Sequence, residues 1–332
     1  MNKYSIILPV KNGGDHAKEC IKSILTQTYL QFNLVILDNC SSDDTISWVK
    51  GLNDQRVMIY NASQPLRMED NWARIINLDK NEFMTIIGHD DLLHPDYLET
   101  MDSLIREDPG ASLYQTHFRY IDSAGKLVRH CQPMAAKQFA YEFLACQMNQ
   151  TLDSTGTGYM MRSKDYDSVG GISPLYPNLI FADYELWMKM IKISYKATAK
   201  AETFSYRLHD SLSRLTNGEE YQQAFGRYML FLAALKGTDP AISATIEQYG
   251  KKMLLYFCES LSHRLLKTPL NLRQTTVGNF INKCRHYASL LLPGQRFCPL
   301  CKVRIFAAWA LDNPLGLTVF KAFKKLYPGK RP

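Results

Sequence analysis

Four aspartates of this 332-residue chain stand where an apolar segment ends or a helix begins: Asp38, Asp90, Asp91 and Asp183. Two carboxylates in one crevice repel each other by roughly 4 kcal/mol at about 4 Å when the effective dielectric constant is about 20. A divalent cation or a hydrogen-bond-donating ligand relieves that repulsion. Hard oxygen ligands that share a cation with diphosphate oxygens are typical of Mg²⁺ and Mn²⁺ sites. The aspartates therefore predict metal-assisted chemistry on a diphosphate compound.

The elements that must position these aspartates are the strands of a parallel sheet. Continuous apolar segments predict buried strands at residues 5–10, 32–37, 57–60 and 83–87. Helical periodicity separates them, first after Asp15, which we expect to cap its helix, and then near 45–51 and 68–78. Such alternation predicts an α/β fold with helices on both faces of the sheet. Ligands of open parallel sheets bind beyond the carboxyl ends of the strands, so the residues that end these strands should converge.

The rest of the chain changes in character along its length. A turn at 122–125 predicts a hairpin between 113–121 and 126–129, followed by a strand at 156–162 and a helix at 182–193. After about residue 215 the strand patterns fade. Helical periodicity then dominates, at 220–236, 241–266 and 276–292. We expect a catalytic domain at 1–215 and a basic helical region at 216–332.

Six short segments, in order, resemble glycosyltransferase family 2: Ser5–Asn12, Asp38–Thr45, Gly88–Asp91, Val169–Gly171, Asp183–Trp187 and Tyr206–His209. Together they span about residues 3–215. The resemblance implies the GT-A fold, a Rossmann-like and mainly parallel sheet. It also implies an inverting transfer of a sugar from a nucleotide diphosphate sugar.

The resemblance assigns the nucleotide site to residues near the strand ends. Asp38 would accept a hydrogen bond from a uracil base. Asp90 would contact the ribose or a metal-bound water. The residues that would line the nucleotide-sugar pocket are Pro9, Val10, Asn12, Asp38, Arg67 and Asp90.

The resemblance places a Mn²⁺ or Mg²⁺ ion on the acidic motif of the family. His89 stands at the first position of that motif, so Asp91 is the expected metal ligand. Some relatives use a further histidine, which here is His209. A neutral imidazole is a suitable ligand, but a loop histidine bonded to the backbone is the alternative interpretation.

Asp183 is the expected general base. The attacking hydroxyl must lose its proton as it displaces the diphosphate, and a carboxylate at the acceptor side contributes about 10²–10⁴-fold to such a step. In many relatives an acidic residue precedes the base, whereas Ala182 stands there in this chain. Because Asp is also favoured at helix N-caps, a purely structural role for Asp183 is the alternative.

Charge is distributed unevenly along the chain. Up to residue 214 there are 22 Lys and Arg against 26 Asp and Glu, and from residue 215 onward there are 17 against 6. A helix at 315–327 would place Leu315, Val319, Phe323 and Leu326 on one face, with lysines toward the other. This pattern suits an interfacial helix on anionic lipid, although a helix packed on the catalytic domain is the alternative. No recognised nucleic-acid-binding module is present, so we expect no nucleic-acid partner.

The absence of certain segments from the sequence predicts where the protein is located and the redox state of its cysteines. No run of 18 apolar residues occurs, and the first apolar segment is too short for a signal peptide. We therefore expect a cytoplasmic protein, and the basic helix at 315–327 would place it at the inner face of the membrane. Its eight cysteines are scattered along a chain of cytosolic character and should be reduced thiols. The Cys298 and Cys301 pair lacks the second pair that a zinc site would need.

The sequence thus predicts a metal-dependent hexosyltransferase of polysaccharide biosynthesis. Its donor would be a nucleotide sugar, with UDP as the expected nucleotide. Its acceptor would be a hydroxyl of a saccharide or lipid-linked glycan. A metal-dependent nucleotidyltransferase is one rival, but the segment Lys11–Gly14 is a poor triphosphate loop. A non-catalytic nucleotide-sugar-binding module is the other rival, and the presence of Asp183 argues against it.

Overall fold

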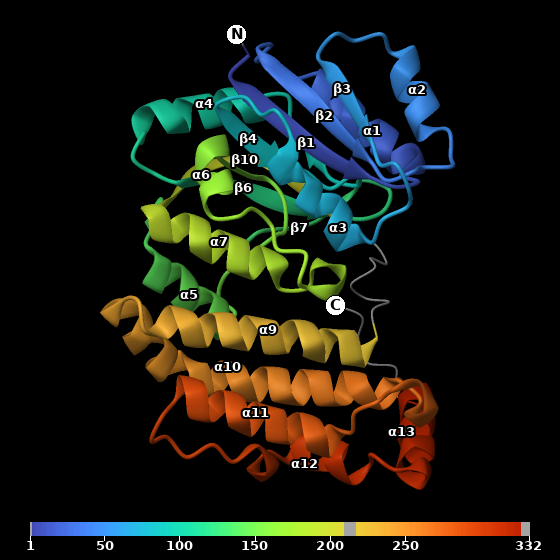
Figure 1. The fold of residues 1–332 in the computed structure, drawn as a ribbon, viewed down its shortest axis with the longest axis vertical. Coiled ribbons are helices and arrows are strands. Elements are labelled where there is room, and N and C mark those ends of the chain that lie inside the picture. Colours follow the sequence, from blue (N-terminus) through green and yellow to red (C-terminus); the bar gives the residue numbers. More distant parts are fainter. Residues whose placement is uncertain (1, 209–216, 327–332) are drawn as a thin grey trace. The chain divides into compact units, whose positions relative to one another are not determined.

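A computed structural model describes residues 2–208 and 217–326 of the chain (Figure 1). The chain divides into two compact units, of which the first comprises Met1–Phe143 with Thr151–Ser211, and the second Leu144–Gln150 with Leu212–Pro332. The predicted boundary between residues 215 and 216 lies outside the described residues and stays a prediction.

The first unit is built around one mixed sheet. Its strands are β1 (Tyr4–Val10), β2 (Phe32–Asp38), β3 (Val57–Asn61), β4 (Phe83–Ile86), β5 (Leu92–Leu93), β6 (Leu113–Ile121), β7 (Leu127–His130), β8 (Lys137–Gln138), β9 (Tyr159–Arg162) and β10 (Lys196–Arg207). They follow the order β3-β2-β1-β4-β9-β6-β10-β5, with β7 beside β6 and β8 beside β10.

The sheet is mixed, because β9 and β5 run against the other strands in its order. The four strands β3, β2, β1 and β4 run parallel, as the sequence predicts. β9 is antiparallel to both of its neighbours, and β10 then runs parallel to β6. Val10 lies opposite Asp38 in the β1–β2 register. The carboxyl ends of these two strands therefore meet at one edge.

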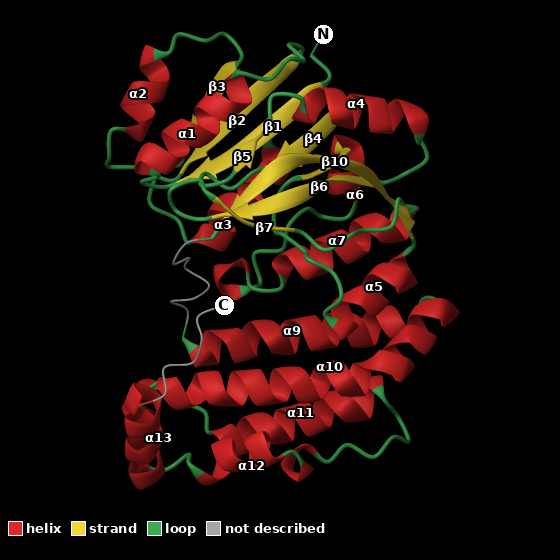
Figure 2. Cartoon of the chain, turned by 180° about the vertical axis from the view of Figure 1, so that it is seen from behind, coloured by secondary structure: helices red, strands yellow, loops and turns green. Residues whose placement is uncertain are grey.

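Helices cover the sheet (Figure 2). In the first unit they are α1 (Gly14–Leu25), α2 (Thr45–Gly51), α3 (Met68–Ala73), α4 (Tyr97–Glu107), α6 (Ser163–Ser168) and α7 (Ala182–Ile193), with 3-10 turns at Arg74–Asn77 and Pro177–Leu179. The predicted helix at 182–193 is confirmed as α7. The predicted cap Asp15 is wrong, because Gly13 is the N-cap and Asp15 lies in the first turn. Instead, Asp43 in the loop after β2 accepts a hydrogen bond from Gly14 N, at the start of α1, at 2.9 Å.

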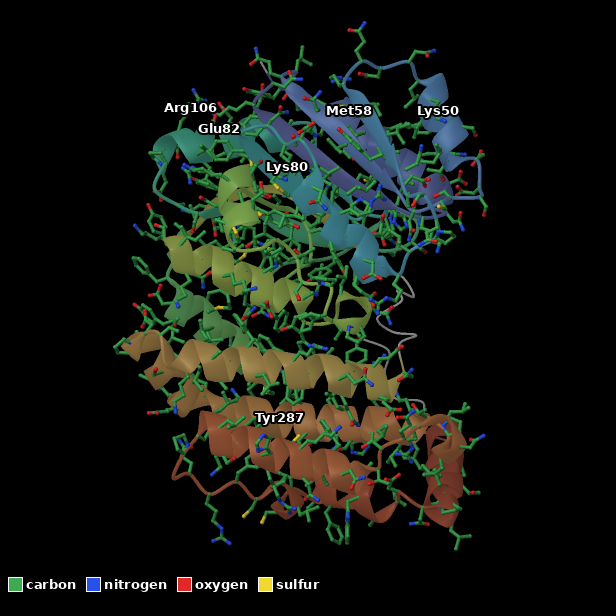
Figure 3. The ribbon with its side chains drawn as sticks, viewed as in Figure 1. Lys50, Met58, Lys80, Glu82, Arg106 and Tyr287 are labelled. Atoms are coloured by element: carbon green, nitrogen blue, oxygen red, sulfur yellow. The ribbon has the colours of Figure 1, made fainter. Side chains whose placement is uncertain are left out.

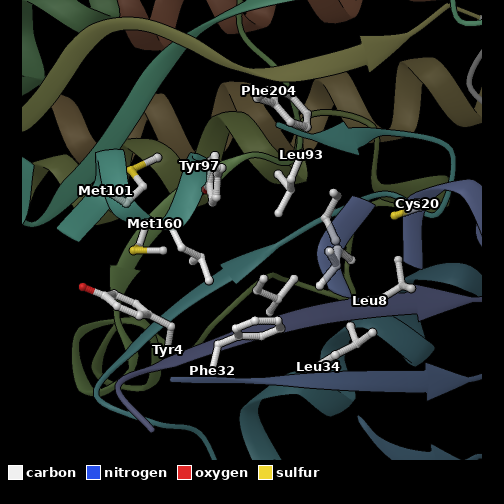
Figure 4. Packing of buried hydrophobic residues seen from close by; sticks show 14 of the residues in the cluster. Tyr4, Leu8, Cys20, Phe32, Leu34, Leu93, Tyr97, Met101, Met160 and Phe204 are labelled. Atoms are coloured by element: carbon white, nitrogen blue, oxygen red, sulfur yellow. The ribbon is translucent and has the colours of Figure 1, made fainter. Parts of the chain in front are cut away.

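The core of the first unit lies between the sheet and helices α1 and α4. Every residue of β1 is buried, as expected for a strand that is covered on both faces. On one face Tyr4 and Leu8 of β1 pack with Cys20 of α1 and Met101 of α4 (Figure 4). Burial on both sides holds β1 rigidly beneath the loops that follow it.

The second unit is helical. Its helices are α9 (Gly218–Lys236), α10 (Pro240–Lys267), α11 (Val277–Leu291), α12 (Val303–Ala310) and α13 (Pro314–Leu326), with 3-10 turns at Leu270–Leu272 and Pro299–Cys301. The helix α5 (Ala140–Asn149) begins in the first unit and ends in the second. α10 packs against α9, α11, α12 and α13.

Close packing fixes α9 against α11. Tyr287 of α11, labelled in Figure 3, stacks edge-on against Phe225 with ring centroids 6.0 Å apart. A Cβ at Gly226 would lie 2.6 Å from the Tyr287 hydroxyl, so a side chain at this position would displace the Tyr287 ring. All eight cysteines are free thiols. Within the described residues, no helix is both long and apolar enough to cross a membrane.

Candidate active site

The loops after β1 and β2 are tied to each other by backbone and side-chain hydrogen bonds. Asn12 N donates to Ser41 Oγ at 2.9 Å, and Ser42 N donates to Asn12 Oδ1 at 2.7 Å. Asn12 has φ 51°, in the left-handed region that asparagine tolerates better than most residues. Asn12 is therefore held in one conformation at the strand end.

Pro9 and Val10 are buried, and Val10 belongs to the hydrophobic core. The Val10 carbonyl accepts from Asn39 N at 2.9 Å. These two residues therefore shape the floor of the site from within the sheet, and Asn12 is the more accessible of the three predicted β1 residues.

Asp38 ends β2 as a buried carboxylate. It accepts from Ser41 N at 3.1 Å, and its own carbonyl accepts from Ala62 N at 2.8 Å. It does not cap the helix after its loop, because α2 has Asp44 as its N-cap. Asp38 is thus a fixed acceptor at the edge where the ends of β1 and β2 meet.

Asn39 positions the segment that contains Arg67. The Asn39 side chain donates to the Leu66 carbonyl at 2.9 Å and accepts from Leu66 N at 2.7 Å. Arg67 itself is exposed and binds Asp70 at 2.7 Å and Glu69 at 3.2 Å. Arg67 would therefore have to release Asp70 and Glu69 before it could contact a nucleotide. The sequence did not point to Asn39.

Asp90 and Asp91 follow β4 in a tight turn. Asp91 N donates to the Gly88 carbonyl at 3.1 Å. A Cβ at Gly88 would lie 2.8 Å from Asp90 Oδ1 and 3.0 Å from Asp91 Oδ2. The two carboxylates therefore lie so close to Gly88 that a side chain there would displace them.

Asp91 is buried and bound from two other segments. Its Oδ2 accepts from Thr157 Oγ1 at 2.8 Å, and its Oδ1 accepts from Arg207 N at 3.0 Å. Burial, followed by the negative charges of Asp91 and Asp90, raises the pKa of the nearby Cys20 thiol well above its usual value. The negative charges of Asp90 and Asp91 thus act on this centre, and the nearby Arg207 opposes their effect.

Arg207 is a buried guanidinium that joins the acidic turn to the rest of the unit. Its Nε donates to the Asp90 carbonyl at 2.7 Å, and a terminal nitrogen binds Glu19 of α1 at 2.8 Å. The other terminal nitrogen donates to the Ser123 carbonyl at 3.0 Å. No sequence pattern pointed to a role for Arg207 or Thr157. The one available signal for Arg207 was its place beside Leu208 and His209 in a family segment.

The carboxylates of the turn after β4 are ligands that suit a divalent cation such as Mg²⁺. Such ions are commonly held by one or two carboxylates together with substrate phosphates and waters, without a full protein cage. A carboxylate oxygen has two lone pairs, so the hydrogen bonds on Asp91 leave metal ligation feasible. Among the described residues, no group of three or more His, Cys, Asp or Glu forms a metal cage. His209, the predicted additional ligand, lies outside them.

Asp183 lies in the first turn of α7. The N-cap is Phe181, with φ 64° and no side-chain cap, so Asp183 is not the capping residue. Asn178 and Leu179 also have positive φ values, of 51° and 58°. Such conformations cost about 1–3 kcal/mol each and concentrate at functional sites. The strained turn delivers Asp183 at the start of a buried helix.

The surroundings of Asp183 are apolar. Burial raises the pKa of its carboxyl to about 6, although nearby backbone N–H groups oppose the shift. Trp187, one turn along α7, donates to the Thr155 carbonyl at 2.9 Å, and its ring lies 4.3 Å from that of Tyr159. α7 is thereby fixed against the segment just before β9.

One loop links the proposed base to the acidic turn. A Cβ at Gly156 would lie 3.9 Å from the Cβ of Asp183. The next residue, Thr157, donates to Asp91. The structure therefore brings both Asp91 and Asp183 to the segment Thr155–Gly158, whereas Asp38 ends β2, which β1 separates from β4.

Comparisons with known proteins agree with this architecture. A family model described as glycosyl transferase family 2 matches residues 5–170. An uncharacterised glycosyltransferase of Rickettsia typhi is 23% identical over 270 residues, which cover 75% of this chain and 80% of that protein. Glycosyltransferase GlyG of Streptococcus pneumoniae is 25% identical over 145 residues, and the match spans 43% of this chain and 47% of GlyG.

A solved structure shares the fold. S. aureus TarS in complex with UDP-GlcNAc has a TM-score of 0.65 to this chain at 13% sequence identity, with 97% of this chain and 92% of the TarS chain covered. At this identity the likeness concerns the fold. The mixed sheet with its helices is GT-A-like, as in TarS, and is followed by C-terminal helices.

Proposed function

The chain belongs to glycosyl transferase family 2 and uses a nucleotide sugar, and we propose that it transfers a hexose from a UDP-sugar, with inversion at the anomeric carbon. The proposed acceptor is a hydroxyl of a saccharide or lipid-linked glycan in polysaccharide biosynthesis. The complex of TarS with UDP-GlcNAc supports UDP as the nucleotide, because TarS has the same fold. A lipid-linked acceptor implies that the enzyme works in the cytoplasm at the inner face of the membrane.

One observation carries the proposal above all. The hydrogen bond between Thr157 and Asp91 closes the acidic turn after β4 onto the loop that adjoins Asp183. A diphosphate group would be held near the first carboxylate and an acceptor hydroxyl near the second. Displacement of a diphosphate by a hydroxyl requires both groups to be held close together, and the shared loop supports this arrangement.

Each residue has a proposed task. Asp38 accepts a hydrogen bond from uracil, which presents an N–H donor on its pairing edge. Asn12 holds the β1 loop against the nucleotide, and Asp90 contacts the ribose. Asp91 would hold Mn²⁺ or Mg²⁺, and a bound cation would offset the charge that grows on the departing diphosphate.

Asp183 takes the proton of the acceptor hydroxyl. With its pKa near 6, the carboxyl is mostly ionised at neutral pH and is a stronger base than an ordinary aspartate. The hydroxyl oxygen forms the new glycosidic bond while the bond between the anomeric carbon and the diphosphate breaks. The electrons of the broken bond leave on the diphosphate.

The experiment is a screen of nucleotide sugars with Mn²⁺ by thermal shift, followed by donor turnover on the best binder. We expect UDP-sugars to stabilise the chain more than GDP- or TDP-sugars. Asp183→Asn should bind the same donor with little change in affinity and lose turnover. Stabilisation by nucleoside triphosphates with release of pyrophosphate would instead establish a nucleotidyltransferase. Donor binding without turnover in any acceptor mixture would favour a non-catalytic module.

A further inference from the structure

The C-terminal part of the second unit has only one acidic residue, and this residue is buried. From Arg264 to the end the sequence has 13 Lys and Arg and one acid, Asp312. The Asp312 side chain forms an ion pair with Arg273, and both side chains are buried. The other oxygen of Asp312 accepts from Val277 N at 2.6 Å. The described surface that follows Arg264 therefore presents positive charge without acidic side chains of its own.

α12 presents aromatic side chains beside this charge. Phe306 is 49% exposed and Trp309 is 47% exposed, and their ring centroids lie 5.7 Å apart. Val303, at the start of the helix, is 81% exposed. Ile305 and Ala308 are buried, and they hold the opposite side of α12 within the unit. α12 thus buries one face and leaves the apolar side chains of the other partly exposed, although the Trp309 ring lies close to Gly278 of α11.

α13, the next helix along the chain, also exposes apolar side chains. Leu315 is 82% exposed and Val319 is also exposed, whereas Leu317 and Phe320 are buried. The exposed pair belongs to the face that the sequence predicts to be interfacial. The five residues that we call the α12–α13 apolar surface are Val303, Phe306, Trp309, Leu315 and Val319.

A rigid corner joins the two helices (Figure 2). Asn313 Oδ1 accepts from Gly316 N at 2.9 Å in the first turn of α13. A Cβ at Gly316 would lie 2.5 Å from the Leu311 carbonyl, so only glycine permits this approach. The corner also contains Asp312, which is anchored to Arg273. The α12–α13 apolar surface is therefore preformed and needs little ordering on binding.

We infer that the α12–α13 apolar surface docks onto an anionic lipid bilayer. Exposed Trp and Phe beside basic residues are the composition of helices that lie in a membrane interface. Lys302 is exposed at the start of α12, and Arg304 is also exposed although it pairs with Glu259 at 2.8 Å. Basic residues near an anionic surface add attraction to that of the buried apolar area.

Other occupants fit the surface less well. Nucleic acid would use the charge but leave Val303, Leu315 and Val319 without a role. A second copy of the chain would bring two basic surfaces together, which like-charge repulsion opposes. The lipid surface alone uses both the charge and the apolar side chains.

Docking deepens the proposed function, because it would bring the enzyme to an acceptor that is itself lipid-linked. Its test measures binding alone and needs no donor, acceptor or turnover. A failure of docking is thereby distinguishable from a failure of the proposed chemistry.

The experiment is co-sedimentation of the full chain with vesicles of phosphatidylcholine that contain about a third phosphatidylglycerol. We expect the wild-type chain to bind these vesicles and to bind pure phosphatidylcholine vesicles at least about tenfold more weakly. The double variant Phe306→Ser, Trp309→Ser should bind the anionic vesicles at least about tenfold more weakly than the wild type. Tyr256→Ser is the matched control, since Tyr256 is 48% exposed on α10 of the same unit. It should bind like the wild type.

A second readout reports insertion directly. Lipids brominated on their acyl chains should quench the fluorescence of Trp309, and Trp309→Phe should lose that quenching. Equal binding of the double variant and the wild type, or an absence of quenching, would overturn the inference. So would a concentration-dependent dimer that the double variant abolishes, or a tighter complex with a short nucleic-acid duplex than with the vesicles.

Discussion

The substitution Asp183→Asn should abolish catalysis and stabilise the fold at the same time. Asp183 is half-buried, and burial raises its pKa to about 6 from an ordinary value of about 3.9. The folded chain therefore holds a proton on this carboxyl more tightly than the unfolded chain does. The stability that this proton contributes is fully present below about pH 4 and is lost as the pH rises through about 6.

The magnitude follows from the two pKa values. One pKa unit corresponds to about 1.4 kcal/mol, so the ionised carboxylate costs the fold up to about 3 kcal/mol at about pH 8. At about pH 5 the folded carboxyl is mostly protonated, and the cost falls to about 1.5 kcal/mol. Water that reaches this half-buried side chain makes both values upper limits. Asparagine is neutral at every pH and avoids the cost, but it cannot accept the proton of the acceptor hydroxyl.

Two measurements test this reasoning. Turnover of Asp183→Asn should fall by about 10²–10⁴-fold, while the wild-type rate should decline as the pH drops below about 6. Thermal denaturation should show a higher Tm for Asp183→Asn at about pH 8, by up to about 10 °C for a unit of this size, and a smaller gain at about pH 5. Asp79→Asn, at an exposed position, is the matched control and should change neither property. Undiminished turnover would refute the general base, and an unchanged Tm at about pH 8 would refute the cost of the buried charge.

Three further predictions concern the acidic turn. Thr157→Val removes the hydroxyl that donates to Asp91, so donor KM should rise and urea denaturation should show a loss of about 1 kcal/mol; unchanged kinetics would mean that this bond does not position Asp91. Arg207→Ala leaves the Asp90 carbonyl without its buried donor and should lower the free energy of unfolding by roughly 2–4 kcal/mol. Arg207→Lys should restore only part of that free energy, because an ammonium group lacks the forked donors of guanidinium. A chelator should stop transfer by the wild type, and Mn²⁺ should restore it, whereas Asp91→Ala should not respond to Mn²⁺; full activity in the chelator would count against the metal site.

The parallel part of the fold could be predicted because its sequence patterns are local. The strands that contain Tyr4–Val10 and Phe32–Asp38 are continuous apolar runs, and α7 shows clear helical periodicity from Ala182. The longest strand, β10 at Lys196–Arg207, escaped prediction. It is rich in Lys, Ala and Glu, which are poor strand formers, and its pairing with β6 is interrupted by two register shifts. Its place in the sheet depends on its neighbours more than on its own sequence.

The residues of the candidate site could likewise be predicted only in part. Asp38 and Asp91 could be proposed because they lie at or shortly after the ends of apolar strands. Thr157 and Arg207 could not be assigned, since their roles depend on contacts with Asp91 that are 66 and 116 residues away in the sequence. The predicted pocket residue Val10 resembles a site residue in the sequence, yet its side chain is part of the core.

The contact between Arg207 and Glu19 also determines when this site can form during protein synthesis. The two residues are 188 positions apart, so the acidic turn gains its buried guanidinium only after almost the whole first unit has left the ribosome. At about 5–20 residues per second, the ribosome needs roughly 10–40 s to traverse that interval. A truncated translation product that ends before β10 would contain Asp38, Asp90, Asp91 and Asp183 but could not assemble them. Nascent and prematurely terminated chains would therefore be unable to consume nucleotide sugar.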